Sequence, residues 1–389
     1  MNNPIVITSA ARTPIGNLLG IFKSISSPQL GSVAIKAALE RSKLQPHEID
    51  DLIMGCVLIA GLGQAPAKQA SLGAGLPTST PCTTINKMCG SGLKAIMFAH
   101  DLIKAESSQI MIAGGMESMT QAPYLALKAR AGYRLGHSQL LDHMFYDGLE
   151  DPYDKGKLAG YFAELCVQKY QFTRQQQDEF ATTSVKRAQE ATQKGLFKEE
   201  ITPVTVGEII IDEDEGPKTA KIDKIPTLKP SFIKDGTVTP ANSSSISDGA
   251  AAVVLMHESE ADKRNLKPLA RILGHATFSK PPAEFTTAPI GAIQALLKKL
   301  QWTVDDVDLF EINEAFAAVV LAAMHDLKIP HEKVNIHGGA CVLGHPIGAS
   351  GARVLTTLIY ALKNTNKKYG VAAVCLGGGE AVALAIEMI

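Results

Sequence analysis

The sequence has neither a long hydrophobic run nor a block of like charges. None of its 389 residues belongs to a stretch of about 18 apolar residues, the length that a membrane span needs. The 38 basic side chains nearly balance the 39 acidic ones, so no nucleic-acid footprint is present. The chain begins without the pattern of a signal or transit peptide and ends without a peroxisomal address. We therefore expect a cytoplasmic protein that binds neither membrane nor nucleic acid.

Cysteine is scarce and scattered, and no Cys-x-x-Cys pair occurs. Cysteines that are spread widely in a reducing compartment are typically buried small side chains or reactive thiols rather than disulfides. The absence of paired spacing also argues against a metal centre. The six cysteines are Cys56, Cys82, Cys89, Cys166, Cys341 and Cys375.

The two halves of the chain resemble each other. An amphipathic helix at 34–41 and a short apolar strand at 52–54 recur as a helix at 292–299 and a strand at 309–312. Farther along, a Ser-Gly pair opens a helix, and an apolar strand that ends in glycines follows; this series also occurs twice. Alternating helices and strands predict a mostly parallel α/β sheet in each half.

A stretch of about 130 residues after the first repeat has no counterpart. It is richer in polar residues, Gly and Pro, and holds one clear helix with a capping box at Thr173 and Gln176 and a stop at Gly195. We predict three units: an N-terminal α/β half (1–119 with 250–268), an inserted loop domain (120–249) and a C-terminal α/β half (269–389).

Cys89 precedes the helix that Ser91-Gly92 opens. A thiol beside the positive end of a helix dipole is expected to have a lowered pKa and to form a thiolate. Its alternative interpretation, a buried cysteine at a tight turn, is about equally favoured by this segment alone.

His345 occupies nearly the symmetric position before the matching helix, in Gly344-His345-Pro346. If the halves are related by a two-fold axis, the two turns meet, and a Cys–His pair is a sound device for acyl transfer. A lone turn histidine is more often satisfied by the backbone. Cys375 ends an apolar strand before Gly377-Gly378-Gly379, where a thiol can transfer protons and backbone N–H groups can hold an oxyanion. A phosphate loop or simple packing is the alternative there.

Asn313 follows the strand at 309–312 and precedes a helix. Its more favoured interpretation is a helix N-cap, and its functional one is an amide that fixes a water or an oxyanion.

Taken together, these segments resemble the thiolase family along nearly the whole chain. The blocks that carry the resemblance, in order, are Ala11–Gly16, Asn86–Gly92, Gly114–Met119, Asn313–Phe316, Gly344–Pro346 and Cys375–Gly379. The resemblance implies a layered αβαβα fold in which Cys89 is acylated, His345 receives its proton and Cys375 deprotonates a second acetyl-CoA. The enolate then attacks the acyl group to give acetoacetyl-CoA, a two-stage reaction that predicts ping-pong kinetics.

The resemblance also implies the remaining site residues and partners. His345 with a water on Asn313 would hold the enolate, and the N–H groups of Cys89 and Gly377 would hold the acyl oxygen. Residues expected along the coenzyme A arm are Phe232, Ser244, Ala315 and Phe316. No metal or redox cofactor is expected, coenzyme A is both substrate and product, and the chain should form a homo-oligomer, a dimer or tetramer.

Two alternatives stay open. One is degradative thiolysis of longer 3-ketoacyl-CoA, since Ala159-Gly160 stands where many family members carry Met-Gly. The other is a thiolase-like lipid carrier without catalysis, against which the intact set of Cys89, Asn313, His345 and Cys375 argues.

Overall fold

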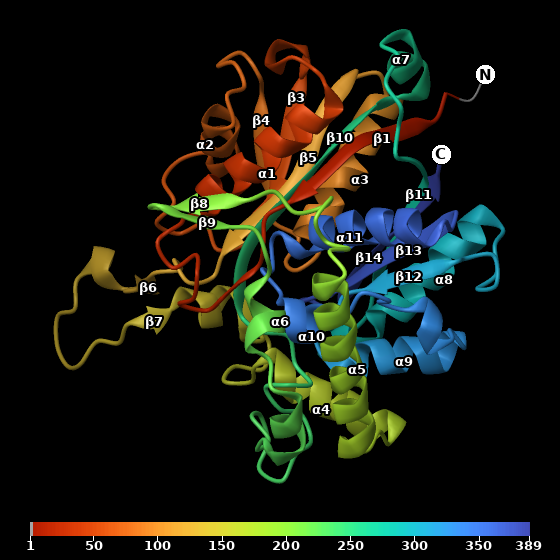
Figure 1. Cartoon of the computed structure of the whole chain (residues 1–389). Helices are drawn as coiled ribbons and strands as arrows, with labels where there is room; N and C mark the ends of the chain where they lie inside the picture. Colours follow the sequence, from red (N-terminus) through yellow and green to blue (C-terminus); the bar gives the residue numbers. More distant parts are fainter. Residues whose placement is uncertain (1–2) are drawn as a thin grey trace.

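One ten-stranded sheet runs through both halves of the chain in a computed structural model that describes residues 3–389 (Figure 1). Its strand order is β12-β13-β14-β11-β1-β10-β5-β3-β4, with the short β2 (Gly16–Asn17) beside β10. The N-terminal strands are β1 (Ile5–Arg12), β3 (Asp51–Gly55), β4 (Cys82–Ile85), β5 (Ile110–Ser118) and β10 (Ser247–His257). The C-terminal strands are β11 (Ala270–Ser279), β12 (Leu309–Ile312), β13 (Tyr369–Leu376) and β14 (Glu380–Met388).

The duplication inferred from the sequence is visible in the strand order. The N-terminal half reads β1-β10-β5-β3-β4, and the C-terminal half reads β11-β14-β13-β12. A parallel bridge between Phe310 and Val334 stands where β4 stands in the first half. The halves join where β1 and β11 pair, with Ile5 opposite Ile272.

The expectation of a mostly parallel sheet is wrong. Only β3–β4, β3–β5 and β12–β13 pair in parallel, and the other strand pairs of this sheet are antiparallel. The physical reason is the last strand of each half. The tight turn Gly377–Gly379 folds β14 back on β13 as a hairpin, and β10 returns antiparallel to β5 after the insertion.

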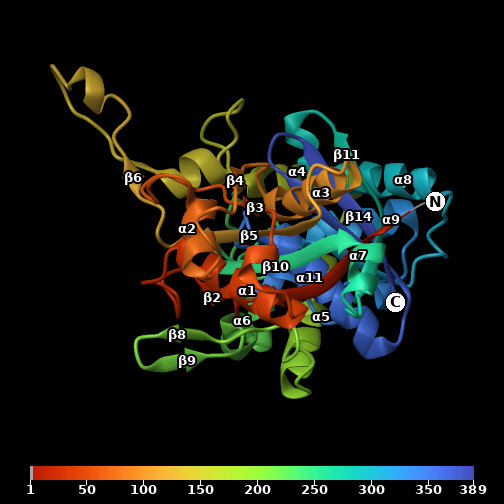
Figure 2. The same cartoon turned by 90° about the horizontal axis from the view of Figure 1, so that it is seen from above.

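Three layers of helices alternate with the two halves of the sheet, which gives five layers (Figures 1 and 2). The helices α1 (Ser27–Ser42) and α2 (Pro66–Gly73) cover the outer face of the first half. The helices α8 (Ala288–Leu300) and α9 (Ala317–Leu327) cover the outer face of the second half. Between the halves lie α3 (Ser91–Lys104) and α11 (Ser350–Thr365), which share one apolar core. The predicted αβαβα layering is confirmed.

The two central helices begin in backbone contact. A Cβ atom on Gly92 would lie 2.8 Å from the backbone nitrogen of Ala352, and one on Gly351 would lie 2.4 Å from that of Leu93. Only glycine permits this approach. The paired Ser-Gly sequences therefore bring the starts of α3 and α11, and the turns before them, to one place.

The segment between β5 and β10 wraps around one end of the sheet. Its elements are β6 (Tyr124–Leu125), β7 (Leu141–Asp142), α4 (Ala159–Tyr170), α5 (Arg174–Gln193), β8 (Val204–Val206), β9 (Ile209–Ile211) and α6 (Glu215–Thr219). The predicted capping box is present in α5, where Gln176 N–H donates to Thr173 Oγ1, and Gly195 follows with φ of 68°. The arm that holds β6 and β7 projects from the body (Figures 1 and 2).

Two short helices complete the fold, α7 (Glu258–Lys263) between the halves and α10 (Ala340–Leu343) before His345. Among residues 3–389, no helix combines the length and apolar character that crossing a membrane requires.

Candidate active site

Three distant stretches of chain meet in one cavity of about 340 Å³. Cys89 comes from the turn before α3, His345 from the turn before α11, and Cys375 from the end of β13, and all three line this cavity. Gly377, Ala315, Phe316 and Ser244 line it too. The juxtaposition of two thiols and one imidazole predicted from the sequence is therefore confirmed.

Burial dominates the electrostatics of Cys89. It raises the pKa of the thiol to about 11, although the backbone N–H groups of Gly377 and of Cys89 itself bond to the sulfur and lower the pKa. The expectation that the start of α3 would lower this pKa is wrong, because desolvation of the thiolate outweighs those dipoles. The free enzyme thus holds a thiol at neutral pH, and its nucleophile needs a base.

His345 is neutral and can therefore accept a proton. Burial, followed by the positive charge of Arg353, lowers the pKa of its imidazole to about 3. The Ser350 hydroxyl donates to the carbonyl of Pro346 (2.9 Å), and with its one proton directed there its oxygen accepts from His345 Nδ1, which lies 2.5 Å away. This arrangement places the ring proton on Nδ1 and leaves the lone pair on Nε2 to receive another.

Cys375 is the more deeply buried of the two thiols. Burial, with the neighbouring Cys89 as a second cause, raises the pKa of Cys375 well above its ordinary value. The dependence on Cys89 shows that the two sulfur atoms are close enough to interact. A thiol of this kind is uncharged in the resting site and is a candidate for proton transfer.

Asn313 lies beside the imidazole and does not cap a helix. The helix α9 begins four residues later, at Ala317, so the N-cap interpretation is wrong. Asn313 Nδ2 is 3.3 Å from His345 Nδ1 and 3.4 Å from Nε2, and its Oδ1 is 3.4 Å from Arg353 Nη2. Arg353 also bonds Glu311, whose pKa burial raises to about 8. The Arg353 guanidinium, itself held by Glu311, therefore fixes the orientation of the Asn313 amide.

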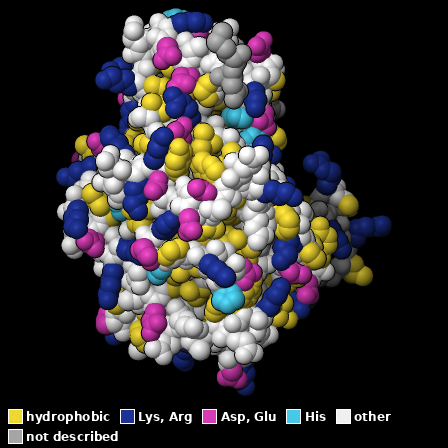
Figure 3. All heavy atoms as spheres, turned by 90° about the vertical axis from the view of Figure 1, so that its right-hand side faces the viewer, with side chains coloured by type: hydrophobic (Ala, Val, Ile, Leu, Met, Phe, Trp, Pro, Cys, Tyr) yellow, Lys and Arg dark blue, Asp and Glu magenta, His cyan; other side chains and the backbone are white. Residues whose placement is uncertain are grey.

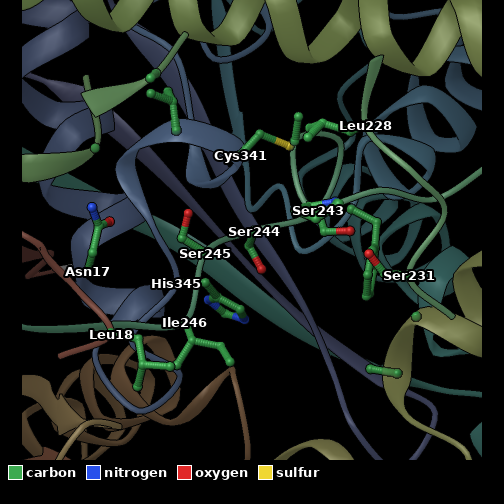
Figure 4. A pocket seen from close by; sticks show the side chains of 18 of the residues that line it. Asn17, Leu18, Leu228, Ser231, Ser243, Ser244, Ser245, Ile246, Cys341 and His345 are labelled. Carbon is green, nitrogen blue, oxygen red and sulfur yellow. The ribbon is translucent and has the colours of Figure 1, made fainter. Parts of the chain in front are cut away.

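A second, larger cavity of about 730 Å³ adjoins the first and shares His345, Phe316 and Ser244 with it. Figure 4 shows Ser243, Ser244 and Ser245 along one stretch of chain beside His345. Lys221 and Lys224 line the same cavity.

The predicted binding residues line these two cavities. The rings of Phe232 and Phe316 pack edge to face, with centroids 6.0 Å apart. Ser244 N–H donates to the carbonyl of Ala315 (3.0 Å), which ties the insertion to the C-terminal half. A Cβ atom on Gly160 would lie 2.3 Å from the Phe232 ring, so the glycine makes room for this wall.

Some site residues escaped the sequence analysis. Ser350 was identified only as a helix start, although a hydroxyl five residues after a histidine in a helix-opening turn is a usable signal. Glu117 accepts bonds from the N–H groups of Val57, Leu58 and Gly348, and burial raises its pKa to about 7. No local pattern predicts that this side chain connects two loops around the site, the one at Val57 and Leu58 and the one at Gly348.

The sequence of the whole chain also matches known protein families. Residues 5–259 match the N-terminal domain of thiolases, and residues 266–388 match the thiolase C-terminal domain. The chain belongs to the thiolase family.

Several relatives of this thiolase cover its full length. A probable acetyl-CoA acetyltransferase of Dictyostelium discoideum is 49% identical, over 99% of this chain and 94% of its own. A cytosolic acetyl-CoA acetyltransferase of Gibberella zeae is 45% identical, over 99% and 98%. The crystal structure of the thiolase Acat5 from Ascaris suum in complex with coenzyme A superposes with a TM-score of 0.95 at 41% identity, covering 99% of this chain and 100% of that one.

Proposed function

We propose that this thiolase joins two molecules of acetyl-CoA into acetoacetyl-CoA and free coenzyme A, and that it runs the same reaction in reverse. The observation that carries the proposal is the shared cavity of Cys89, His345 and Cys375. The relatives named above support acetyl-CoA as the substrate.

In the first half-reaction, Cys89 attacks the thioester carbon of acetyl-CoA. Because its thiol pKa is about 11, the proton must leave during the attack, and Nε2 of the neutral His345 receives it. The bond between the acyl carbon and coenzyme A sulfur breaks, and the departing sulfur takes that proton. Acetyl-Cys89 remains.

In the second half-reaction, Cys375 passes its thiol proton to the neutral His345 and, as the thiolate, removes a proton from the methyl group of a second acetyl-CoA. The carbanion attacks the acetyl carbon on Cys89, and the Cys89 sulfur leaves and takes the proton that His345 holds. Oxyanions form in both stages and need donors that are already in place. The N–H groups that bond the Cys89 sulfur, those of Cys89 and Gly377, suit the acyl oxygen, and the His345–Asn313 pair suits the enolate.

The larger cavity suits the coenzyme A arm. Its walls near the site are apolar, with Phe232 and Phe316, and the cationic Lys221 and Lys224 suit the phosphates. These donors supply what the chemistry needs, so we propose that the reaction uses no metal or redox cofactor.

We further propose a cytoplasmic homo-oligomer. The Gibberella relative is named cytosolic. The projecting arm exposes large apolar side chains, among them Leu135 (98% exposed) and Leu140 (69%), which a second copy of the chain would cover. Lysine and arginine alternate with acidic residues on the face in Figure 3, which offers no basic stripe for nucleic acid.

Cys375→Ala tests the mechanism, with Cys166→Ala as the control because Cys166 is a buried thiol outside the cavity. With acetyl-CoA, Cys375→Ala should release one coenzyme A per site and carry an acetyl group on Cys89 by mass spectrometry. Its condensation rate should fall by ~10²–10⁴-fold, the usual contribution of a general base. Condensation at the wild-type rate, or loss of acetylation as well, would refute the assigned role.

Longer substrates are the second candidate, favoured by the small Ala159 that lines both cavities. Thiolysis rates for acetoacetyl-CoA and a series of longer 3-ketoacyl-CoA decide between them. A higher kcat/KM for the longer members would show a degradative enzyme. A carrier without catalysis would show turnover with none of them.

A further inference from the structure

His100, Asp101 and His275 form a cluster outside the cavities just described. Asp101 Oδ1 lies 2.9 Å from His100 Nδ1 and 2.9 Å from His275 Nε2. The two rings meet edge to face, with centroids 5.1 Å apart. Among residues 3–389, these three form the one group of at least three potential metal ligands whose ligand atoms lie within 4.8 Å of one another.

The cluster joins the two halves of the molecule. His100 and Asp101 lie near the end of α3, and His275 lies on β11 of the C-terminal half. At 1.5 Å per residue, His100 is about 13 Å along α3 from Ser91, so the cluster is separate from the Cys89 turn. The sequence alone does not reveal this cluster, because one ligand lies more than 170 residues from the other two.

We propose that His100, Asp101 and His275 bind a Zn²⁺ ion, or a similar borderline transition-metal ion, that links α3 to β11. Two imidazole nitrogens and one carboxylate oxygen are a common ligand set for Zn²⁺, with water completing the coordination. The Asp101 side chain is 51% exposed, which leaves that water a place.

The two distances to Asp101 suit such an ion after a small adjustment, and the two imidazole nitrogens lie within 4.8 Å of each other. Adjacent ligand atoms of a tetrahedral site lie about 3.3 Å apart when the metal–nitrogen bonds are ~2.0–2.1 Å. The two bonds of 2.9 Å to Asp101 therefore need to open by a few tenths of an ångström. Each imidazole would move its proton to the nitrogen that faces away from the ion.

The surroundings select among metals. Burial lowers the pKa of both imidazoles, so they are neutral and able to ligate. Three lysines, Lys94, Lys104 and Lys299, lie close enough to lower those pKa values further. With one carboxylate against three ammonium groups, hard ions that bind by charge alone, such as Mg²⁺, are disfavoured. Ions that form strong bonds to imidazole are favoured.

Calorimetric titration of the full chain with Zn²⁺ tests the proposal. A background with Cys89→Ser and Cys375→Ser removes the active-site thiols, which would bind Zn²⁺ themselves. We expect one equivalent to bind, no binding of Mg²⁺, and a rise in melting temperature with Zn²⁺. Affinity should fall at least tenfold in His275→Gln.

Two further variants complete the test. Asp101→Asn should lose affinity with little risk to folding, because this side chain is half exposed. His325→Gln should retain it, since His325 bonds Asp326 at 2.9 Å in an exposed pair with no third ligand. Co²⁺ in place of Zn²⁺ should give a visible spectrum without a thiolate charge-transfer band. Absence of binding, or an affinity in His275→Gln and Asp101→Asn equal to that of the background without these substitutions, would overturn the proposal.

Discussion

Replacing Ser350 by alanine removes the hydroxyl that accepts the Nδ1 proton of His345. Two losses follow. The neutral ring no longer has a partner that selects its Nδ1–H form, and the imidazolium that forms when Nε2 takes the Cys89 proton loses a bond to its charged donor. A hydrogen bond to a charged group contributes ~1.5–3 kcal/mol. At ~1.4 kcal/mol per factor of ten, kcat/KM should therefore fall by about 10- to 150-fold.

Steady-state thiolysis of acetoacetyl-CoA provides the assay. The fall should appear in kcat, with a smaller change in KM, because the bond matters most when His345 is charged. Ser350→Thr, which restores a hydroxyl, should recover part of the rate.

Thr365→Ala is the matched control for Ser350→Ala. Thr365 lies on the same helix, α11, and its hydroxyl donates to the carbonyl four residues earlier (2.7 Å), as Ser350 does, but it bonds no imidazole. If Ser350→Ala keeps kcat/KM within twofold of wild type, or if both variants lose equally, the tautomer argument fails.

Three other outcomes are expected. Alkylation of Cys89 in the free enzyme should accelerate about tenfold per pH unit from pH 7 to 10, since its thiol pKa is about 11; a plateau below pH 8 would contradict this. Burial raises the pKa of Glu117 from 4.5 to about 7, so the folded state keeps a proton that the unfolded state releases, and this costs stability as pH rises through that window. The free energy of unfolding, measured with urea, should therefore rise in Glu117→Gln relative to wild type as the pH goes from 5 to 7. If the difference between the two proteins does not change with pH, the raised pKa of Glu117 is contradicted. Replacing Leu135 and Leu140 by glutamate should lower the mass measured by light scattering if the arm joins copies of the chain, and an unchanged mass would rule the arm out.

Motifs at chain turns allowed the prediction that Cys89, His345 and Cys375 share one cavity. Cys89 and His345 each precede a Ser-Gly pair that opens a helix, and the internal repeat placed those turns in equivalent positions. The helices do begin in contact there, through Gly92 and Gly351. The internal repeat thus predicted that two turns far apart in the sequence lie close together, which local spacing alone does not predict.

Quantities that depend on burial were not predictable in the same way. The dipole of α3 indicated a lowered thiol pKa for Cys89, and desolvation reversed the sign. Burial is a property of all surrounding elements, so a motif of seven residues does not contain it. The same applies to Glu117 and to the His100–Asp101–His275 cluster, whose partners lie far away in sequence.

The duplication explains how one site both binds and reacts. In each half, one connection joins the strands that stand third and second in the sheet order, counted from β1 or β11. It is a short turn in one half and a long insertion in the other. In the C-terminal half, the Gly377–Gly379 turn joins β13 to β14 and carries the donor N–H that contacts Cys89. In the N-terminal half, the equivalent connection from β5 to β10 is the segment with Phe232 and Ser244, which walls the larger cavity. Because these connections occupy equivalent places on related halves whose central helices touch, both reach the same pocket. Both copies of the repeat therefore provide reacting groups, Cys89 from the first and His345 and Cys375 from the second, and the insertion in the first adds the wall of the larger cavity.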